Sequence, residues 1–418
     1  MARPVAHVVG AGVSGLAAAV KLATAGASVA LYEAAGQGGG RCRSYHEPAL
    51  DMEIDNGNHL VLSGNHATQD YLGLIDARTE LSGPDDASFP FVDLRTRERW
   101  TLRPNAGRLP WWIFRPERRV PGTRALDYLS LAGLLTARKG ATIGEAMSCS
   151  GTLYEKLWRP LLLAVLNTEP AGGSASLAAA VVKETLALGG SACRPLVAVN
   201  GLSRAFVDPA LKTLEAKGGS VRFGRRLRKI RYGGAAVSGL DFGDETIEVA
   251  PDDHVILATP SWVAADLVHG LEVPNAQCAI VNGHFRFDPP PGAPAMLGLV
   301  GGTVEWIFAF PGRISITISG ADNLLERTRE DLAETFWREI QIALDFEAPM
   351  PAWQVIKEKR ATFSASPAQD ARRPKPTTAW RNLFLAGDYT AGSLPATIEF
   401  AIRSGFRAAE LVGAAKRG

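Results

Sequence analysis

The sequence has few cysteines and no long apolar run. Its four cysteines stand far apart, without Cys-X-X-Cys spacing, at Cys42, Cys149, Cys193 and Cys278. This pattern indicates a reducing compartment and argues against a disulfide scaffold and a structural zinc site, so we expect no metal. Because no stretch of 18 or more uninterrupted apolar residues occurs, a membrane-spanning helix is not expected. We expect a cytoplasmic protein, either soluble or bound to the inner face of the cytoplasmic membrane.

An excess of charge of one sign is also absent. The 45 lysines and arginines nearly balance the 43 aspartates and glutamates, which leaves a formal net charge of +2. A nucleic-acid partner is therefore not expected, since such proteins carry a strong basic footprint. The 418 residues are enough for two domains and a large core.

A glycine-rich motif follows the first strand-like segment. Gly10, Gly12 and Gly15 have the spacing Gly-X-Gly-X-X-Gly, and an alanine-rich helix comes next. In this context the glycines allow a tight turn, the close approach of a pyrophosphate and close packing of helix on sheet. The helix N-terminus, which includes Ser14, faces the phosphates with free N–H groups and a positive dipole end.

An acidic residue closes the second predicted strand, Ser28 to Tyr32. Glu33 stands eighteen residues after Gly15, where its carboxylate can accept hydrogen bonds from a ribose. An acid at this place favours a free 2′-hydroxyl over a 2′-phosphate. Gly39, Gly40 and Arg41 come shortly after, and the whole segment predicts a dinucleotide-binding fold.

The C-terminal part contains a second motif. A short strand ends at Gly387-Asp388, and a long helix is predicted from Leu394-Pro395-Ala396-Thr397-Ile398-Glu399, with the proline in its first turn. Gly-Asp can present an acid and a backbone N–H to the second half of a cofactor. A helix N-terminus aimed at a flavin pyrimidine ring stabilises the negative charge formed there on reduction. The alternative is a helix that only docks on the core.

A polar cluster interrupts the strand pattern of residues 51–62. It contains Asp55, Asn56, Gly57, Asn58 and His59. Gly57 lets a flat group lie against the backbone, whereas Asn-Gly alone is also a strong turn signal. Both interpretations stay open from the residues alone.

Residues 109–139 combine apolar and basic side chains. Leu109-Pro110-Trp111-Trp112-Ile113-Phe114 precedes several arginines, and a leucine-rich stretch, 126–135, precedes Arg138-Lys139. Such a segment suits peripheral contact with an anionic membrane. It equally suits an internal lid whose leucines and tryptophans face the core. The apolar helices expected at 157–166 and 175–188 either wall an apolar cavity or belong to an ordinary core.

The second half of the chain alternates between two kinds of structure. We expect a strand around Leu227, within 226–230, to pass beside the nucleotide. Residues 254–260 are predicted to form a buried strand. Residues 279–319 predict an antiparallel sheet, because Ile314, Ile316 and Ile318 alternate with polar residues. An amphipathic helix at 324–345 and a linker at 372–376 follow.

These blocks together resemble the FAD-dependent amine oxidase and phytoene desaturase superfamily over essentially the whole chain. The resemblance implies FAD as cofactor, with Glu33, Gly39, Gly40 and Arg41 at the ribose and pyrophosphate. It implies an α/β fold with a Rossmann-like FAD-binding domain of the glutathione reductase type and an inserted α+β substrate domain. We expect the FAD-binding domain to be discontinuous and the substrate domain to fill the gaps, with boundaries at 1–65, 190–262 and 376–418 for the first and 66–189 and 263–375 for the second.

Within the superfamily, residues 55–59 and 394–399 are similar to the squalene-associated branch, the hydroxysqualene dehydroxylases, although relatives more often carry Gln at the position of Asn58. This branch implies that a reduced flavin replaces the hydroxyl of a hydrophobic C30 isoprenoid, hydroxysqualene, by hydrogen to give squalene for hopanoid lipids. A general acid protonates the hydroxyl and the cavity excludes water. His59, a tunable acid near neutral pH, and Asp55 are the candidates for the acid or a proton relay.

Three other functions use the same motifs. A carotenoid or phytoene desaturase would move electrons from the substrate to the oxidised flavin. An amine oxidase would need aromatic residues at the flavin face, where Thr397 stands. A protein with the FAD fold that has lost turnover and carries lipids is the third alternative, and the presence of Glu33, Arg41 and Asp388 argues against it. No second Gly-X-Gly-X-X-Gly occurs in strand and helix context, so electrons must come from an external reductant or reductase.

Overall fold

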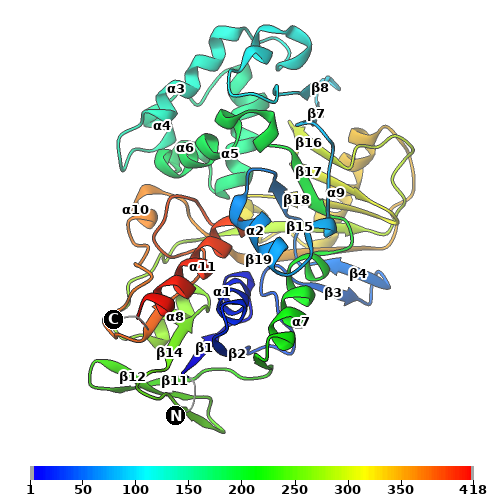
Figure 1. Ribbon diagram of the computed structural model, residues 1–418. Coiled ribbons are helices and arrows are strands. Elements are labelled where there is room, and N and C mark those ends of the chain that lie inside the picture. Colours follow the sequence, from blue (N-terminus) through cyan, green and yellow to red (C-terminus); the bar gives the residue numbers. More distant parts are fainter. Residues whose placement is uncertain (1–3, 416–418) are drawn as a thin grey trace.

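The centre of the molecule is a parallel sheet. A computed structural model (Figure 1) describes residues 4–415. Its five-stranded sheet has the order β10-β2-β1-β14-β20. Strand β1 lies in the middle, and the chain order reverses there. Ligands of open α/β sheets bind at such a switch point, beyond the carboxyl ends of the strands. The strands are β1 (Val5–Val9), β2 (Ser28–Tyr32), β10 (Ser220–Arg222), β14 (His254–Leu257) and β20 (Leu383–Leu385).

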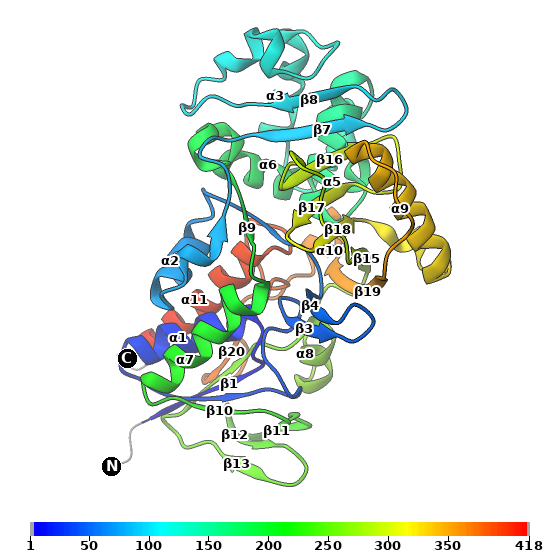
Figure 2. The ribbon, with the colours of Figure 1, turned by 90° about the vertical axis from the view of Figure 1, so that its right-hand side faces the viewer.

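Three helices cover one face of this sheet, α1 (Val13–Thr24), α7 (Asp208–Ala216) and α11 (Ile398–Ala415) (Figure 2). Helix α1 is buried along almost its whole length because alanines and glycine let its neighbours come close. A Cβ on Gly405 of α11 would lie 2.1 Å from the backbone oxygen of Ser14. The two helices therefore cross in direct backbone contact.

A small antiparallel sheet and α8 (Ser261–Leu267) cover the other face, and its strands are β11 (Lys229–Gly233), β12 (Ala236–Asp241) and β13 (Thr246–Glu248). The strand predicted at 226–230 begins only at Lys229. The backbone before Lys229 instead hydrogen-bonds to the residue that follows β2, since Arg225 N donates to Glu33 O at 2.7 Å. Leu227 is nevertheless buried in the core between the two layers.

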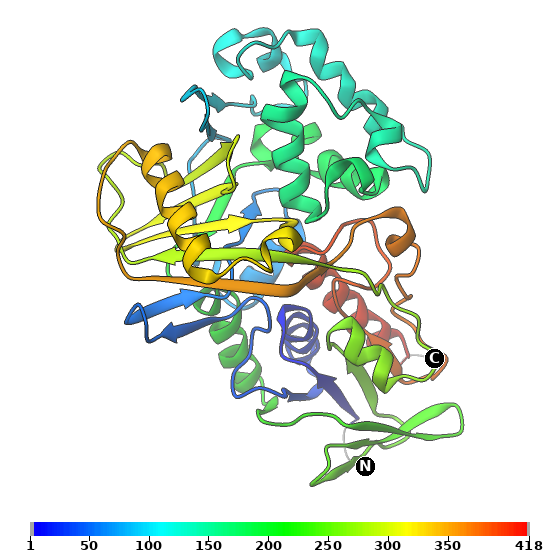
Figure 3. The same cartoon turned by 180° about the vertical axis from the view of Figure 1, so that it is seen from behind.

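A larger, seven-stranded sheet has the order β19-β15-β18-β17-β16-β7-β8. The ribbon drawn from behind shows α9 (Arg329–Leu344) lying across its outer face (Figure 3). Ile314, Ile316 and Ile318 of β18 pack under α9, which confirms their predicted alternation. The opposite face is also covered, so Ser315, one of the polar residues of the alternation, is fully buried as well. The strands are β7 (Phe89–Asp93), β8 (Arg99–Leu102), β15 (Gln277–Phe285), β16 (Met296–Val300), β17 (Trp306–Phe310), β18 (Arg313–Ile318) and β19 (Trp353–Phe363).

Residues 103–192 form a helical region against that opposite face. Its helices include α3 (Ser130–Leu135), α4 (Ile143–Ala146), α5 (Arg159–Leu166) and α6 (Ala175–Glu184). The predicted helix at 175–188 ends at Glu184, where Thr185 leaves helical geometry. No helix of the described residues is long and apolar enough to cross a membrane.

Short elements connect these parts. The strand pattern of residues 51–62 is two strands, β4 (Met52–Asp55) and β5 (Leu60–Leu62), because the polar cluster separates them. The predicted helix at 324–345 begins later, at Arg329, where Thr328 caps it. The remaining elements are β3 (Ser44–Glu47), α2 (His66–Leu74), β6 (Leu81–Ser82), β9 (Pro195–Ala198) and α10 (Pro367–Asp370).

Candidate functional site

The three glycines of the first motif have different surroundings. A Cβ on Gly10, whose φ is +107°, would lie 2.5 Å from Ala258 O, and a Cβ on Gly15 would lie 1.9 Å from Gly10 O. Both positions therefore require glycine for the packing of the protein itself. A Cβ on Gly12 would meet no atom within 4 Å. Gly12 faces open space at the carboxyl end of β1, where a pyrophosphate would lie.

The Gly-Gly-Arg segment lies beside this loop. Gly39 N donates to Ala11 O at 2.7 Å, and Gly39 forms a bridge with Gly12. The nearest atom to a Cβ on Gly40 would be Gly12 Cα at 3.5 Å. No side chain caps the N-terminus of α1, so its first N–H groups are available to an anion. The loop and the segment fit a bound pyrophosphate.

Glu33 is fixed at the carboxyl end of β2. Its Oε2 accepts from Ala11 N at 2.7 Å and its Oε1 accepts from Ala35 N at 2.8 Å. A carboxylate offers about four acceptor positions, so Glu33 can also accept from ribose hydroxyls. Gly224 N donates to Ala35 O, which brings the segment leading to Leu227 alongside.

The two motifs meet through one ion pair. Arg41 Nη2 lies 2.7 Å from Asp388 Oδ2, and Arg41 also donates to Ala361 O. Gly387 N donates to Ser404 Oγ of α11 at 2.8 Å, which fixes the backbone before Asp388. Residues from the two ends of the chain thus form one continuous polar surface.

Arg373 supports this surface, and sequence reasoning missed it because residues 372–376 read as a linker. Its guanidinium donates to Thr390 O at 2.8 Å and to Gly392 O at 3.2 Å. The rings of Phe363 and Phe400 lie 5.2 and 4.7 Å from it. An arginine among prolines gives no local signal of such burial.

The C-terminal helix begins later than predicted. Helix α11 starts at Ile398, so Pro395 precedes the helix rather than lying in its first turn. Thr397 Oγ1 accepts from Phe400 N at 3.1 Å and acts as the N-cap. Pro395 is buried, while Ala396, Thr397 and Ile398 are partly exposed. Residues 394–397 therefore form a non-helical segment that leads directly into the N-terminus of α11.

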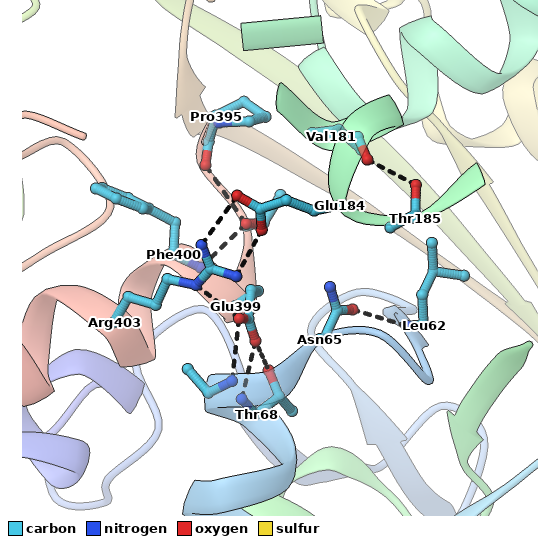
Figure 4. Close-up of polar contacts among 12 residues, drawn as sticks. Leu62, Asn65, Thr68, Val181, Glu184, Thr185, Pro395, Glu399, Phe400 and Arg403 are labelled. Carbon is cyan, nitrogen blue, oxygen red and sulfur yellow. Dashed lines mark hydrogen bonds and ion pairs between the residues drawn. The ribbon is translucent and has the colours of Figure 1, made fainter. Parts of the chain in front are cut away.

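Glu399 connects this turn to the start of α2 (Figure 4). It is 3% exposed and accepts from Thr68 N at 2.8 Å, from Thr68 Oγ1 at 2.7 Å and from Ala67 N. Its other partner, Arg403, donates through Nε at 2.7 Å and also donates to both carboxylate oxygens of Glu184. The group, which we call the Glu399 clamp (Thr68, Glu184, Glu399 and Arg403), joins α2, α6 and α11.

Asp55 is buried, and both of its hydrogen bonds go to one carboxylate oxygen, Oδ1. It accepts from Ser44 Oγ at 2.6 Å and from Leu202 N at 2.8 Å, and Arg313 lies 3.8 Å away. Burial raises the pKa of Asp55, against the lowering effect of these partners. A raised pKa suits an acid, although the hydrogen bonds to Ser44 and Leu202 hold this carboxyl in place.

His59 and its neighbours lie over the large sheet. Asn58 Nδ2 donates to Thr317 Oγ1 at 3.1 Å, and Gly57 packs against Asn282. His59 is half-buried. Burial, and secondarily the charge of Arg41, lowers the pKa of His59 to about 4. His59 is therefore neutral at pH 7, whereas its type alone suggested a group that titrates near neutrality.

Glu305, between β16 and β17, is a further acidic group that sequence reasoning missed. Its Oε2 accepts from Ser319 N at 2.8 Å. Burial raises the pKa of Glu305 to about 7, while Ser319 and Arg159 lower it. No motif surrounds this glutamate, so only the fold could reveal it.

A family model settles the family of the chain. The model of the flavin containing amine oxidoreductases matches residues 13–413. The chain belongs to this family. The protein is thus an FAD-dependent oxidoreductase with an α/β FAD-binding fold.

Relatives within the family are similar over nearly their whole length. The chain is 53% identical to a hydroxysqualene dehydroxylase of Sinorhizobium fredii over 97% of both chains. It is 52% identical to one of Rhodopseudomonas palustris, over 98% of this chain and 99% of that one. A third, of Zymomonas mobilis, is 47% identical.

Solved structures show the same fold at low identity. An oxidoreductase from Methanosarcina mazei superposes with a TM-score of 0.73 at 14% identity, covering 97% of this chain and 100% of that one. A putrescine oxidase variant superposes with a TM-score of 0.71 at 17% identity over 99% of both chains.

Proposed function

We propose that the protein catalyses the FAD-dependent reductive dehydroxylation of hydroxysqualene to squalene. The observation that carries this proposal is the 53% identity to a protein named hydroxysqualene dehydroxylase over 97% of both chains. The product would serve hopanoid synthesis.

We assign the cofactor to the polar surface described above. Gly12 and Ser14 would face the pyrophosphate, while Gly10 and Gly15 would give the loop the shape that binds it. Glu33 would face the ribose, and Leu227 the adenine side. Gly39, Gly40, Arg41, Gly387 and Asp388 would hold the middle of FAD, and Gly57, Asn58 and 395–398 would lie at the flavin.

The chemistry needs one proton and one hydride for each hydroxyl removed. Bound, reduced flavin supplies the hydride. The proton goes to the hydroxyl, which leaves as water, and apolar walls keep other water away from the electron-poor carbon. His59 and Asp55 remain our candidates for proton transfer. Because His59 is neutral at pH 7, it would act as a relay between another proton donor and the hydroxyl.

We propose a discontinuous FAD-binding domain of the glutathione reductase type, built from 1–65, 190–262 and 376–418, and an inserted α+β substrate domain built from 66–189 and 263–375. Electrons would come from an external reductant or reductase. A single turnover of the pre-reduced enzyme without oxygen tests the reaction.

A further inference from the structure

Exposed apolar side chains gather in one short part of the chain. Within the described residues, eight large hydrophobic side chains are exposed, and five of them lie between positions 109 and 129. These five are 48 to 80% exposed, whereas the other three are only 37 to 39% exposed. We call the five side chains the apolar tip, which consists of Leu109, Trp111, Phe114, Leu126 and Leu129.

The core of the same segment is formed by other side chains. Trp112 and Tyr128 are buried and meet edge to face, with ring centroids 5.2 Å apart. Tyr128 also meets Trp158 at 6.2 Å. This contact brings the short 3-10 turn Trp111–Phe114 against the turn Ala125–Leu129. The tip is therefore not needed to close the core, and an internal lid does not explain its exposure.

Positive charge surrounds the apolar tip. Residues 105–140 contain seven basic and two acidic residues, in a chain that is nearly balanced. Arg108, Arg115 and Arg124 are exposed. Arg118 lies 5.0 Å from the ring of Trp111, so its charge stays next to an apolar side chain.

The segment lies at one extremity of the molecule. In all three ribbon views, which share a vertical axis, its teal ribbon forms the top end, far from the parallel sheet around β1. A flat surface can reach this end without meeting the rest of the protein.

We propose that the apolar tip and its arginines dock the protein on an anionic lipid bilayer. Apolar side chains enter the interface while arginines meet phosphate groups, and these two contributions add. Two short turns carry the tip, so it offers neither a continuous helix ridge nor a sheet edge to a protein partner. The docking surface does not depend on the proposed reaction.

Sedimentation with phospholipid vesicles tests the proposal. We expect FAD-loaded protein to bind phosphatidylcholine vesicles that contain phosphatidylglycerol, with weaker binding to pure phosphatidylcholine and at high salt. Replacing Leu109, Phe114, Leu126 and Leu129 by Ser should lower the partition coefficient at least about tenfold. Replacing Arg108, Arg115 and Arg124 by Gln should remove the preference for phosphatidylglycerol.

A matched control separates the tip from general surface apolarity. Phe223→Ser with Met350→Ser removes exposed apolar side chains elsewhere and should leave binding unchanged. FAD content and thermal unfolding should match the wild type in every variant. Unchanged vesicle binding of the tip variant overturns the proposal. So does concentration-dependent dimerisation of a wild-type protein that ignores vesicles, since a second copy would then cover the tip.

Discussion

Arg41 Nη2 lies 2.7 Å from Asp388 Oδ2, so the Gly-Gly-Arg segment and the C-terminal Gly-Asp segment form one surface. Arg41→Ala leaves Asp388 buried without its ion pair and removes a cation from the proposed pyrophosphate site. We expect FAD affinity to fall at least about tenfold, which corresponds to roughly 1.4 kcal/mol. Titration of the apoprotein with FAD, followed by flavin fluorescence, measures this. Arg381→Ala is the exposed control, and equal loss in both variants would contradict the assignment.

Gly10 and Gly12 should respond differently to alanine. At Gly10 the new Cβ would lie 2.5 Å from Ala258 O, at a φ of +107°, so the fold itself should lose several kcal/mol. At Gly12 the Cβ meets no protein atom within 4 Å. Gly12→Ala should therefore fold normally but bind FAD weakly. Chemical unfolding and FAD titration of both variants decide this, and tight FAD binding by Gly12→Ala would be inconsistent with a phosphate at that position.

Within the Glu399 clamp, we expect the loss of Glu399 to destabilise the fold much more than the loss of Glu184. Glu399→Ala removes the acceptor from Thr68 and leaves buried donors unsatisfied, at a cost of about 3 kcal/mol. Glu184→Ala removes an ion pair whose two side chains are 29 and 35% exposed, which is worth about 0 to 1 kcal/mol. Urea unfolding compares the two variants. Equal losses would show that the clamp does not act through α2.

Two neutral histidines should make the protein sensitive to acid. Burial lowers the pKa of His284 to about 3, and the pKa of His59 is about 4. Both groups have a pKa of 6.5 when unfolded, so the unfolded chain binds more protons between pH 6.5 and the folded pKa values. Their contribution is complete above pH 6.5 and is lost as the pH falls toward 4 and 3, at up to about 1.4 kcal/mol per pH unit for each histidine.

Urea unfolding at a series of pH values measures this slope. In His284→Asn the slope below pH 6.5 should be smaller than in the wild type, whatever the absolute stability of the variant. An unchanged slope would mean that His284 protonates in the folded protein.

Local patterns in the sequence predicted much of the fold. The strand predicted at 28–32, between the helix after the glycine motif and the acidic Glu33, matches β2. The sequence also suggested FAD and the family, since the glycine spacing and the acid at Glu33 are close together in the chain. The helix predicted from Leu394 starts only at Ile398, because a threonine cap outweighed the proline signal.

Contacts between distant residues could not be predicted in this way. Glu399 caps α2 across more than three hundred residues, and Arg373 is buried by rings from two other segments. The sequence pattern also could not show which of Trp111 and Trp112 is buried. Both residues lie in a 3-10 turn that is too short to show a periodicity of apolar residues. Trp111 is nevertheless half-exposed, whereas Trp112 is buried.

The most direct measurement is a single turnover of anaerobic, photoreduced enzyme with hydroxysqualene dispersed in detergent. We expect squalene to form in proportion to the flavin that is reoxidised, with water as the other product. The oxidised enzyme should give no product. Reoxidation without squalene, or desaturation of a polyene such as phytoene by the oxidised enzyme, would contradict reductive dehydroxylation.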